Sequence, residues 1–281
     1  VVLGVGTEPV VPAAFAGVVG KEVFHAADYL DHRPGLAGAA DVTVVGSGQS
    51  GAEVFVDLLR AQEHEGWALR WLTRSPAFAP MEQSPLGLEH FTPDYVRYFR
   101  SLPEHARDGL VASQWQLHRA ISPETIAHVF DLLYERAAAG RPAAATLTPN
   151  VEVTGAARAG GRVELAGVER HQGAAWTVRT DRVVLATGYA PRRPPFLAGL
   201  GDAVRWDGAG RYDVDEHYRV ALDPAVGGAL YVQNAEQHRN GVGTPDLGLG
   251  AHRSAVILNA VAGRVVHRLP GTSSFTTFGV A

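Results

Sequence analysis

Three glycines, Gly46, Gly48 and Gly51, have the residue type and spacing most directly tied to a chemistry in this chain of 281 residues. An apolar run at 41–45 precedes them, and helical periodicity follows to about residue 59. In a strand–turn–helix unit, the first two glycines of a G-x-G-x-x-G pattern let the backbone approach a pyrophosphate, and the third lets the helix pack closely on its strand. The pattern predicts a dinucleotide-binding turn, while a glycine-rich turn without a ligand stays open as the alternative.

A second predicted strand, at 67–73, places Arg74 where such a fold inspects the 2′ position of the nucleotide ribose. An acidic residue there would favour NAD, whereas an arginine pairs with a 2′-phosphate. We therefore expect NADPH as the nucleotide. A solvated arginine at the end of a strand is the alternative interpretation.

Composition excludes several classes of protein. The formal net charge of −4 gives no basic field for nucleic acid, and the apolar stretches are too short for a membrane span. The chain has no cysteine, which excludes disulfides, thiolate catalysis and cysteine-ligated metal. With 46% hydrophobic residues the chain can bury a substantial core, and we expect a cytoplasmic protein.

Helix signals concentrate between residues 93 and 140. Thr92-Pro93 and Ser122-Pro123 are typical helix starts and predict helices at 93–102 and 123–139, with a third at 104–120 between them. The histidines of this region, at 105, 118 and 128, lack the spacing of metal ligands, and we expect no metal.

Three other segments have irregular composition. The long proline-punctuated stretch 75–94 is predicted to be an ordered, functional loop, and the Pro/Gly stretch 33–40 a domain linker. Gly4 and Gly6 are not read as a phosphate loop because prolines, rather than a helix, follow them.

Short alternating strands follow from residue 146. The runs at 151–153, 162–165, 175–178 and 182–185 predict a small antiparallel meander, with Gly-rich turns between the strands. The last run leads into Thr187, Gly188 and Tyr189. A strand-end turn that needs a glycine is one interpretation of this triplet.

Five motifs in a fixed order carry a more specific indication. They are Gly4-Val-Gly-Thr-Glu-Pro9, Gly46-Ser-Gly-Gln-Ser-Gly-Ala-Glu53, Phe91-Thr-Pro-Asp-Tyr95, Ala186-Thr-Gly-Tyr189, and Tyr231-Val-Gln-Asn234 with Arg253-Ser-Ala-Val-Ile257. In these motifs the chain resembles the microbial N-hydroxylating flavoprotein monooxygenases, the L-lysine N6-hydroxylases and L-ornithine N5-hydroxylases of siderophore biosynthesis. The motifs span the whole chain.

The resemblance implies an enzyme that uses NADPH, FAD and O₂ to hydroxylate the side-chain amine of a free amino acid. No catalytic side chain is assigned. Cofactor contacts are implied for Gly46, Gly48, Gln49, Ser50 and Arg74 toward NADP⁺, for Thr187, Gly188 and Tyr189 near the cofactors, and for 240–249, including Leu247, toward the flavin. A helix at about 252–263 would pack under the flavin domain.

Two departures from the family matter. Its members carry an earlier glycine fingerprint that binds the FAD pyrophosphate, and this sequence has no such segment, so we expect it to correspond to the C-terminal two-thirds of the enzyme. Where the family often has a Leu-Ser pair near the flavin, this chain has Leu247-Gly248.

The expected substrate is L-lysine, with L-ornithine as the runner-up. Leu88-Glu89 and Ala120-Ile121-Ser122 resemble the lysine type, which places Glu89 and Ser122 near the substrate. A site discriminates one methylene by only about 10- to 200-fold, so two residues do not decide between the two amino acids.

The expected fold class is α/β, with a Rossmann-like NADPH-binding domain at 36–180 that contains the helical insertion 93–140. It would be inserted in an incomplete FAD-binding domain formed by 1–35 and 181–281, as in flavoproteins that bind two dinucleotides. Missing first strands would expose apolar surface and favour a homo-oligomer or pairing with an N-terminal FAD-binding segment. The alternative from another class is an NADP-binding fragment or split partner without turnover. A flavin-free reductase is disfavoured because the chain has no Tyr-x-x-x-Lys motif.

Overall fold

The structure, a computed structural model, describes residues 1–280. The chain forms two compact units. The sheet unit comprises Pro9–Met81 and Arg119–Ala190, and the C-terminal unit comprises Val1–Glu8, Glu82–His118 and the residues from Pro191 onward. Strands β2 (Thr7–Pro9) and β11 (Tyr189–Pro191), which pair with each other, lie where the chain passes from one unit to the other.

A five-stranded parallel sheet is the centre of the sheet unit. Its strands are β3 (Val23–His25), β10 (Arg182–Leu185), β4 (Asp41–Val45), β5 (Ala68–Leu72) and β6 (Ala145–Thr148), in the spatial order β3-β10-β4-β5-β6. Parallel strands are buried on both faces, which explains their continuous apolar runs. Because side chains alternate along a strand, Val184 packs in the core on one face while Val183 and Leu185 pack in the core on the other.

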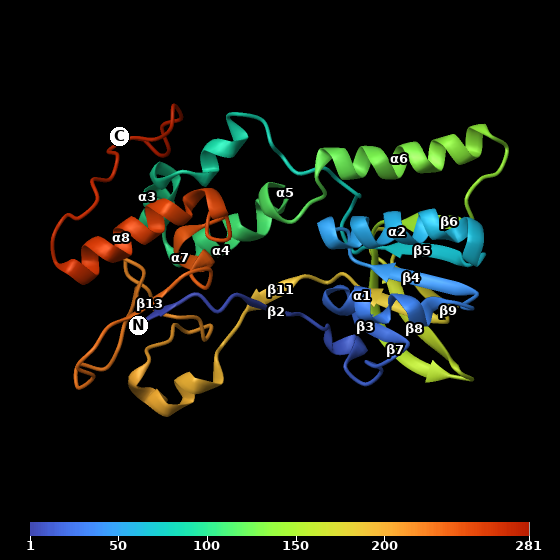
Figure 1. Ribbon diagram of the computed structural model, residues 1–281, viewed down its shortest axis with the longest axis horizontal. Helices are drawn as coiled ribbons and strands as arrows, with labels where there is room; N and C mark the ends of the chain where they lie inside the picture. Colours follow the sequence, from blue (N-terminus) through green and yellow to red (C-terminus); the bar gives the residue numbers. More distant parts are fainter. Residues whose placement is uncertain (281) are drawn as a thin grey trace. The chain divides into compact units, whose positions relative to one another are not determined.

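Helices α2 (Gln49–Glu65) and α6 (Pro123–Ala138) cover one face of this sheet, together with the short α1 (Tyr29–His32) (Figure 1). Helix α2 ends at Gly66, whose φ of 77° is the left-handed conformation that closes many helices. The next residue, Trp67, is fully buried and donates its indole N–H to the carbonyl of Leu58. The helix therefore turns back directly into β5.

The other face carries an antiparallel meander of β7 (Val151–Ala159), β8 (Arg162–Glu169) and β9 (Ala174–Thr180). The predicted meander is confirmed for these three strands and wrong for the fourth. The run 182–185 is β10, which inserts between β3 and β4 of the parallel sheet because both of its faces are apolar.

The C-terminal unit has little extended structure. Strand β1 (Val2–Leu3) pairs parallel with β13 (Leu230–Val232), and β12 (Arg219–Val220) pairs antiparallel with β13. Its helices are α3 (Pro93–Ser101), α4 (Glu104–Ser113), α5 (Trp115–His118), α7 (Gln237–Asn240) and α8 (Gly250–Ala262). Three small apolar clusters replace a single core.

The predicted helix at 104–120 is interrupted. Helix α4 ends at Ser113, and Gln114 departs from helical geometry before α5 begins. Tertiary contacts use this segment: the Tyr95 hydroxyl donates to Gln114 Oε1 at 2.9 Å, and the amide of Glu82 donates to the carbonyl of Gln116. The second contact occupies a backbone carbonyl that a continued helix would use for its own hydrogen bonds.

The compact units do not follow the predicted domain boundaries of 35/36 and 180/181. Residues 9–35 belong to the sheet unit because β3 pairs with β10, and residues 181–190 belong there because β10 pairs with β4. Most of the helical insertion, 93–118, belongs to the C-terminal unit. The stretch 33–40 is not a linker between compact units, since it lies inside the sheet unit and buries Leu36 and Ala39.

Candidate functional site

The glycine turn lies where β4 passes into α2. Gly46 has a φ of 115°, and a methyl group built on it would overlap the carbonyl of Ala186. A methyl group on Gly51 would overlap the carbonyl of Gly46, so the helix approaches its strand as closely as the pattern predicts. The Trp71 indole N–H donates to the Gly46 carbonyl at 2.7 Å and fixes the turn against β5.

No side chain caps the first turn of α2. Gly48 stands at the N-cap in an extended conformation and provides no side-chain cap. The first amides of a helix have no intrahelical partner, and the helix dipole favours negative charge at this end. A pyrophosphate here would accept hydrogen bonds from these backbone amides.

Gln49 does not offer its side chain to a ligand. Its Oε1 accepts the amide of Ser122 at 2.8 Å, and its Nε2 donates to Thr125 Oγ1 at 3.0 Å and Glu53 Oε1 at 2.9 Å. These contacts fasten the start of α6 to the glycine turn. Of Gln49, only the backbone remains to cradle a nucleotide, and Ser50 follows it in the same helical turn.

Arg74 lies at the same edge of the sheet as the glycine turn. Strand β5 pairs with β4 in register Val45↔Leu72, and the amide of Gly46 donates to the carbonyl of Leu72. Across residues 1–280 the exposed Arg74 side chain has no hydrogen-bond or ion-pair partner. The contact of Arg74 with a 2′-phosphate stays a prediction.

Thr187, Gly188 and Tyr189 follow β10 at this edge. The Thr187 hydroxyl donates to the carbonyl of Val10, so it supports the backbone rather than a ligand. The carbonyl of Gly188 accepts the amide of Val10 and lies 3.1 Å from His25 Nε2. Tyr189 is about half exposed and meets the His25 ring edge-on.

His25 is a residue that sequence reasoning missed. Its Nδ1 accepts the amide of Ala27, which leaves Nε2 as the donor to Gly188 and defines a neutral imidazole. Burial lowers the pKa of His25 below its usual range. The ring fixes the turn after β10. The signal in the sequence was its place at the end of a short apolar strand.

The two residues predicted near the substrate have other partners. The Glu89 carboxylate accepts the amides of Phe275 and Thr276 and the Thr276 hydroxyl, so it holds the C-terminal segment. These hydrogen bonds lower the pKa of Glu89. Ser122 caps α6: its Oγ accepts the amide of Thr125. Glu89 and Ser122 lie in different compact units.

Leu247 lies on the segment expected near the flavin and is 86% exposed. Polar side chains are buried on and beside this segment. Arg253 donates to the carbonyls of Thr244 and Asp246, and its guanidinium lies 4.0 Å from the carboxylate of Glu236. Burial raises the pKa of Glu236 to about 7.

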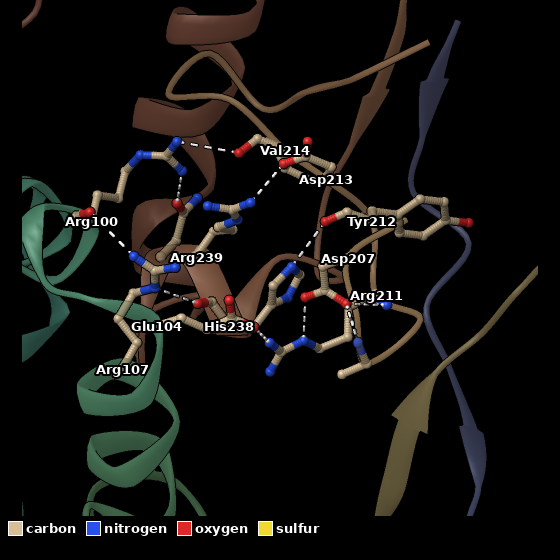
Figure 2. A network of polar contacts seen from close by, with 12 residues as sticks. Arg100, Glu104, Arg107, Asp207, Arg211, Tyr212, Asp213, Val214, His238 and Arg239 are labelled. Carbon is tan, nitrogen blue, oxygen red and sulfur yellow. Dashed lines mark hydrogen bonds and ion pairs between the residues drawn. The ribbon is translucent and has the colours of Figure 1, made fainter. Parts of the chain in front are cut away.

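A second polar network lies in the C-terminal unit (Figure 2). Arg107 donates to the carbonyls of Leu102 and His238, and Arg100 donates to Asn240 Oδ1 and the carbonyl of Val214. The buried His238 has Nε2 2.9 Å from the Tyr212 carbonyl, and burial lowers its pKa. Backbone carbonyls and the amide oxygen of Asn240 thus occupy these donors, which fasten α3 and α4 to 212–240.

The described residues fit one dinucleotide. In residues 1–280, a strand that passes through glycines directly into a long helix occurs at β4–α2 alone. That turn fits the pyrophosphate of NADPH. These residues provide no second turn of this kind for the pyrophosphate of FAD. The same residues contain no cluster of three or more side chains suited to a metal, and no helix long and apolar enough to cross a membrane.

Comparisons with known proteins identify a matching family and several similar proteins. The family described as L-lysine 6-monooxygenase/L-ornithine 5-monooxygenase matches residues 1–191. The rhizobactin siderophore biosynthesis protein RhbE of Rhizobium meliloti is 39% identical over 290 residues, covering 100% of this chain and 63% of that protein. The putrescine N-hydroxylase of Shewanella oneidensis is 36% identical over 277 residues, covering 99% and 54%.

The crystal structure of DfoA of Erwinia amylovora bound to FAD, the cadaverine monooxygenase of desferrioxamine biosynthesis, superimposes with a TM-score of 0.93 and 36% identity. The match covers 100% of this chain and 64% of DfoA. The chain therefore spans less than two-thirds of the length of each of these relatives, and the expected α/β flavin-monooxygenase fold is confirmed over that part.

Proposed function

We propose, since the chain belongs to the L-lysine 6-monooxygenase/L-ornithine 5-monooxygenase family, that it forms the NADPH-binding part of a flavin-dependent N-hydroxylase of siderophore biosynthesis. The observation that carries the proposal is the glycine turn: Gly46 and Gly51 have no room for a side chain, and the amides of α2 beyond them have no side-chain cap. When bound, NADPH supplies a hydride.

The chain's own residues would bind and orient this nucleotide. Backbone amides at the start of α2 would hold the pyrophosphate, and Arg74 would hold the 2′-phosphate. Trp71 and the Gln49 side chain would keep the turn in place, because each is hydrogen-bonded to the backbone of a neighbouring segment. A pre-formed turn binds its ligand without a cost for ordering the backbone.

The expectation for the substrate changes in light of the relatives. Two relatives that match nearly the whole chain are named for the unbranched diamines putrescine and cadaverine. The lysine expectation was based on Glu89 and Ser122, whose side chains bind the C-terminal segment and cap α6. We therefore place an unbranched aliphatic diamine first and L-lysine second, with L-ornithine behind them.

Nucleotide binding is the first test. Titration of the purified chain with NADPH and with NADH, followed by quenching of tryptophan fluorescence, should show tighter binding of NADPH. Loss of that preference in Arg74→Ala would support the assignment of Arg74 to the 2′-phosphate. A wild-type chain that binds neither nucleotide would overturn the proposed NADPH-binding role.

Turnover is the second test. The chain, supplied with FAD, NADPH and O₂, is incubated with putrescine, cadaverine, L-lysine or L-ornithine, and the hydroxylamine product is measured. Faster reaction of a diamine supports the order given above, whereas faster reaction of L-lysine reverses it. NADPH binding without any product would favour the other hypothesis, a nucleotide-binding fragment or split partner.

A further inference from the structure

A second arginine lies beside Arg74, although 96 residues separate the two along the chain. Arg170 follows β8 of the meander, and its Nη1 donates to the carbonyl of Arg74 at 3.2 Å. The meander covers the opposite face of the sheet from α2, so sequence spacing gives no reason to connect Arg170 with the nucleotide. Only the fold brings the two residues together.

Backbone hydrogen bonds join the segments that carry Arg74 and Arg170. The amide of Arg170 donates to the carbonyl of Asn150 at 2.8 Å, and the amide of Asn150 donates to the carbonyl of Ser75 at 3.0 Å. The next amide, of Val151, donates to the carbonyl of Thr73 at 2.9 Å. The residue after β8 is therefore tied, through the start of β7, to the residues on both sides of Arg74.

The charge of Arg170 is only partly neutralised. Arg170 is exposed and has one ion pair, between its Nε and Glu152 Oε2 at 3.8 Å, which leaves the guanidinium donors largely available. The nearby carboxylate of Glu169 accepts the amide of Gln172 within its own turn. The guanidinium of Arg170 thus reaches the backbone from which the Arg74 side chain starts, and two cations that start from neighbouring backbone segments suit a shared anion. Planar guanidinium groups bind phosphate with paired hydrogen bonds.

We propose that Arg170 is the second arm of the 2′-phosphate site, so that Arg74 from the end of β5 and Arg170 from the meander grip the same phosphate. This proposal rests on the proposed function, since it needs the nucleotide to lie on the glycine turn. It makes Arg170 a residue that determines the preference for NADPH over NADH. It also gives the meander a role in recognition, because it delivers a cation that the strand–turn–helix unit lacks.

The test compares nucleotide affinities of four variants of the full chain with wild type. Arg170→Ala should weaken NADPH binding about 10-fold and leave NADH binding unchanged, since one charge-assisted hydrogen bond is lost. Arg170→Lys should recover part of the loss because it keeps the charge. Glu152→Gln should tighten NADPH binding, since it removes the carboxylate that competes for Arg170.

Arg179→Ala is the matched control. Arg179 lies on the same meander and pairs with Glu164 at 2.8 Å, so its removal should not change the ratio of the two affinities. Titration with 2′-AMP should show the same order of variants as NADPH. Circular dichroism of each variant establishes that it is folded.

The outcomes separate the two proposals. If wild type prefers NADPH and Arg170→Ala keeps that preference, the role of Arg170 is overturned and the proposed function stands. The same holds if Glu152→Gln does not affect NADPH binding. If wild type binds neither nucleotide, both proposals fail.

Discussion

The two compact units satisfy their buried polar groups in different ways. In the sheet unit, strand ladders and backbone-directed side chains do this work: Gln62 donates to the carbonyls of Trp67 and Ala144, and Thr43 donates to Thr180. Within the described residues, buried side-chain atoms without a hydrogen-bond partner lie mainly in the C-terminal unit, at Tyr212, Asn234, Glu236, Thr244 and Arg253. The sheet unit has Arg162 Nε, which forms an ion pair with Asp181 at 2.7 Å.

This difference concerns how each unit is held together. Buried polar atoms without a partner are costly, and in native proteins they are bound by water or by a ligand. The sheet unit carries two contiguous apolar cores and a turn shaped for one ligand. The C-terminal unit holds its short elements together with arginine side chains that donate to backbone carbonyls and to Asn240.

The largest expected effect tests the close approach in the sheet unit. Gly46→Ala should destabilise that unit by about 3 to 5 kcal/mol and abolish NADPH binding, because the new methyl group meets the Ala186 backbone and the φ is positive. Amide hydrogen exchange of β4 and α2, with NADPH titration, measures both effects.

Gly66→Ala separates the effect of the close contact from the effect of the positive φ. Gly66 also has a positive φ, of 77°, but open space surrounds it, so the change should cost only about 1 kcal/mol and preserve NADPH binding. Equal losses in the two variants would contradict the role of close packing at Gly46.

The next largest effect is expected when the buried pair Arg253–Glu236 of the C-terminal unit is broken. Arg253→Met should cost about 3 kcal/mol, because it leaves the Glu236 carboxylate buried without a cation and frees the carbonyls of Thr244 and Asp246. Hydrogen exchange of 236–249 is the measurement. The double variant with Glu236→Gln should recover part of the loss, and strict additivity of the two changes would argue against their coupling.

A pH series compares the stability of the two units. The pKa of Glu236 is about 7 in the folded chain, against an ordinary value of 4.5, so the folded state binds the proton more tightly. The resulting stabilisation is fully present below about pH 4.5, where both states are protonated, and stability of the C-terminal unit should fall, by about 3 kcal/mol, as the pH rises from about 4.5 through 7.

Hydrogen exchange of 236–249, corrected for the intrinsic pH dependence, follows this change. The sheet unit should not share it, and Glu236→Gln should flatten the profile. A wild-type profile that is already flat over this range would contradict the assignment to Glu236.

The smallest effect concerns Ser122. Ser122→Ala should destabilise α6 by about 1 kcal/mol, because the amide of Thr125 loses its cap. If capping is the whole role, the KM for the amine stays unchanged. Thermal unfolding and steady-state kinetics measure the two quantities, and a several-fold rise in KM without a loss of stability would restore Ser122 as a substrate residue.

Local pattern determined much of this protein. The glycine spacing, the buried strands at 41–45 and 68–72, and the capped helices that begin at Pro93 and Pro123 were all predicted, because periodicity, turn chemistry and capping act within a few residues. The family could also be recognised from five short motifs in order.

Long-range packing decided the rest. No local signal placed β10 inside the parallel sheet, broke the helix before Trp115, or turned Glu89 toward the C-terminal segment. The meeting of Arg170 with Arg74 is of the same kind. The sequence by itself determined which segments become strands, turns and helices, because those preferences are local. Which side chains share a site was decided only by the tertiary structure, because it depends on strand order and on contacts between residues far apart in the chain.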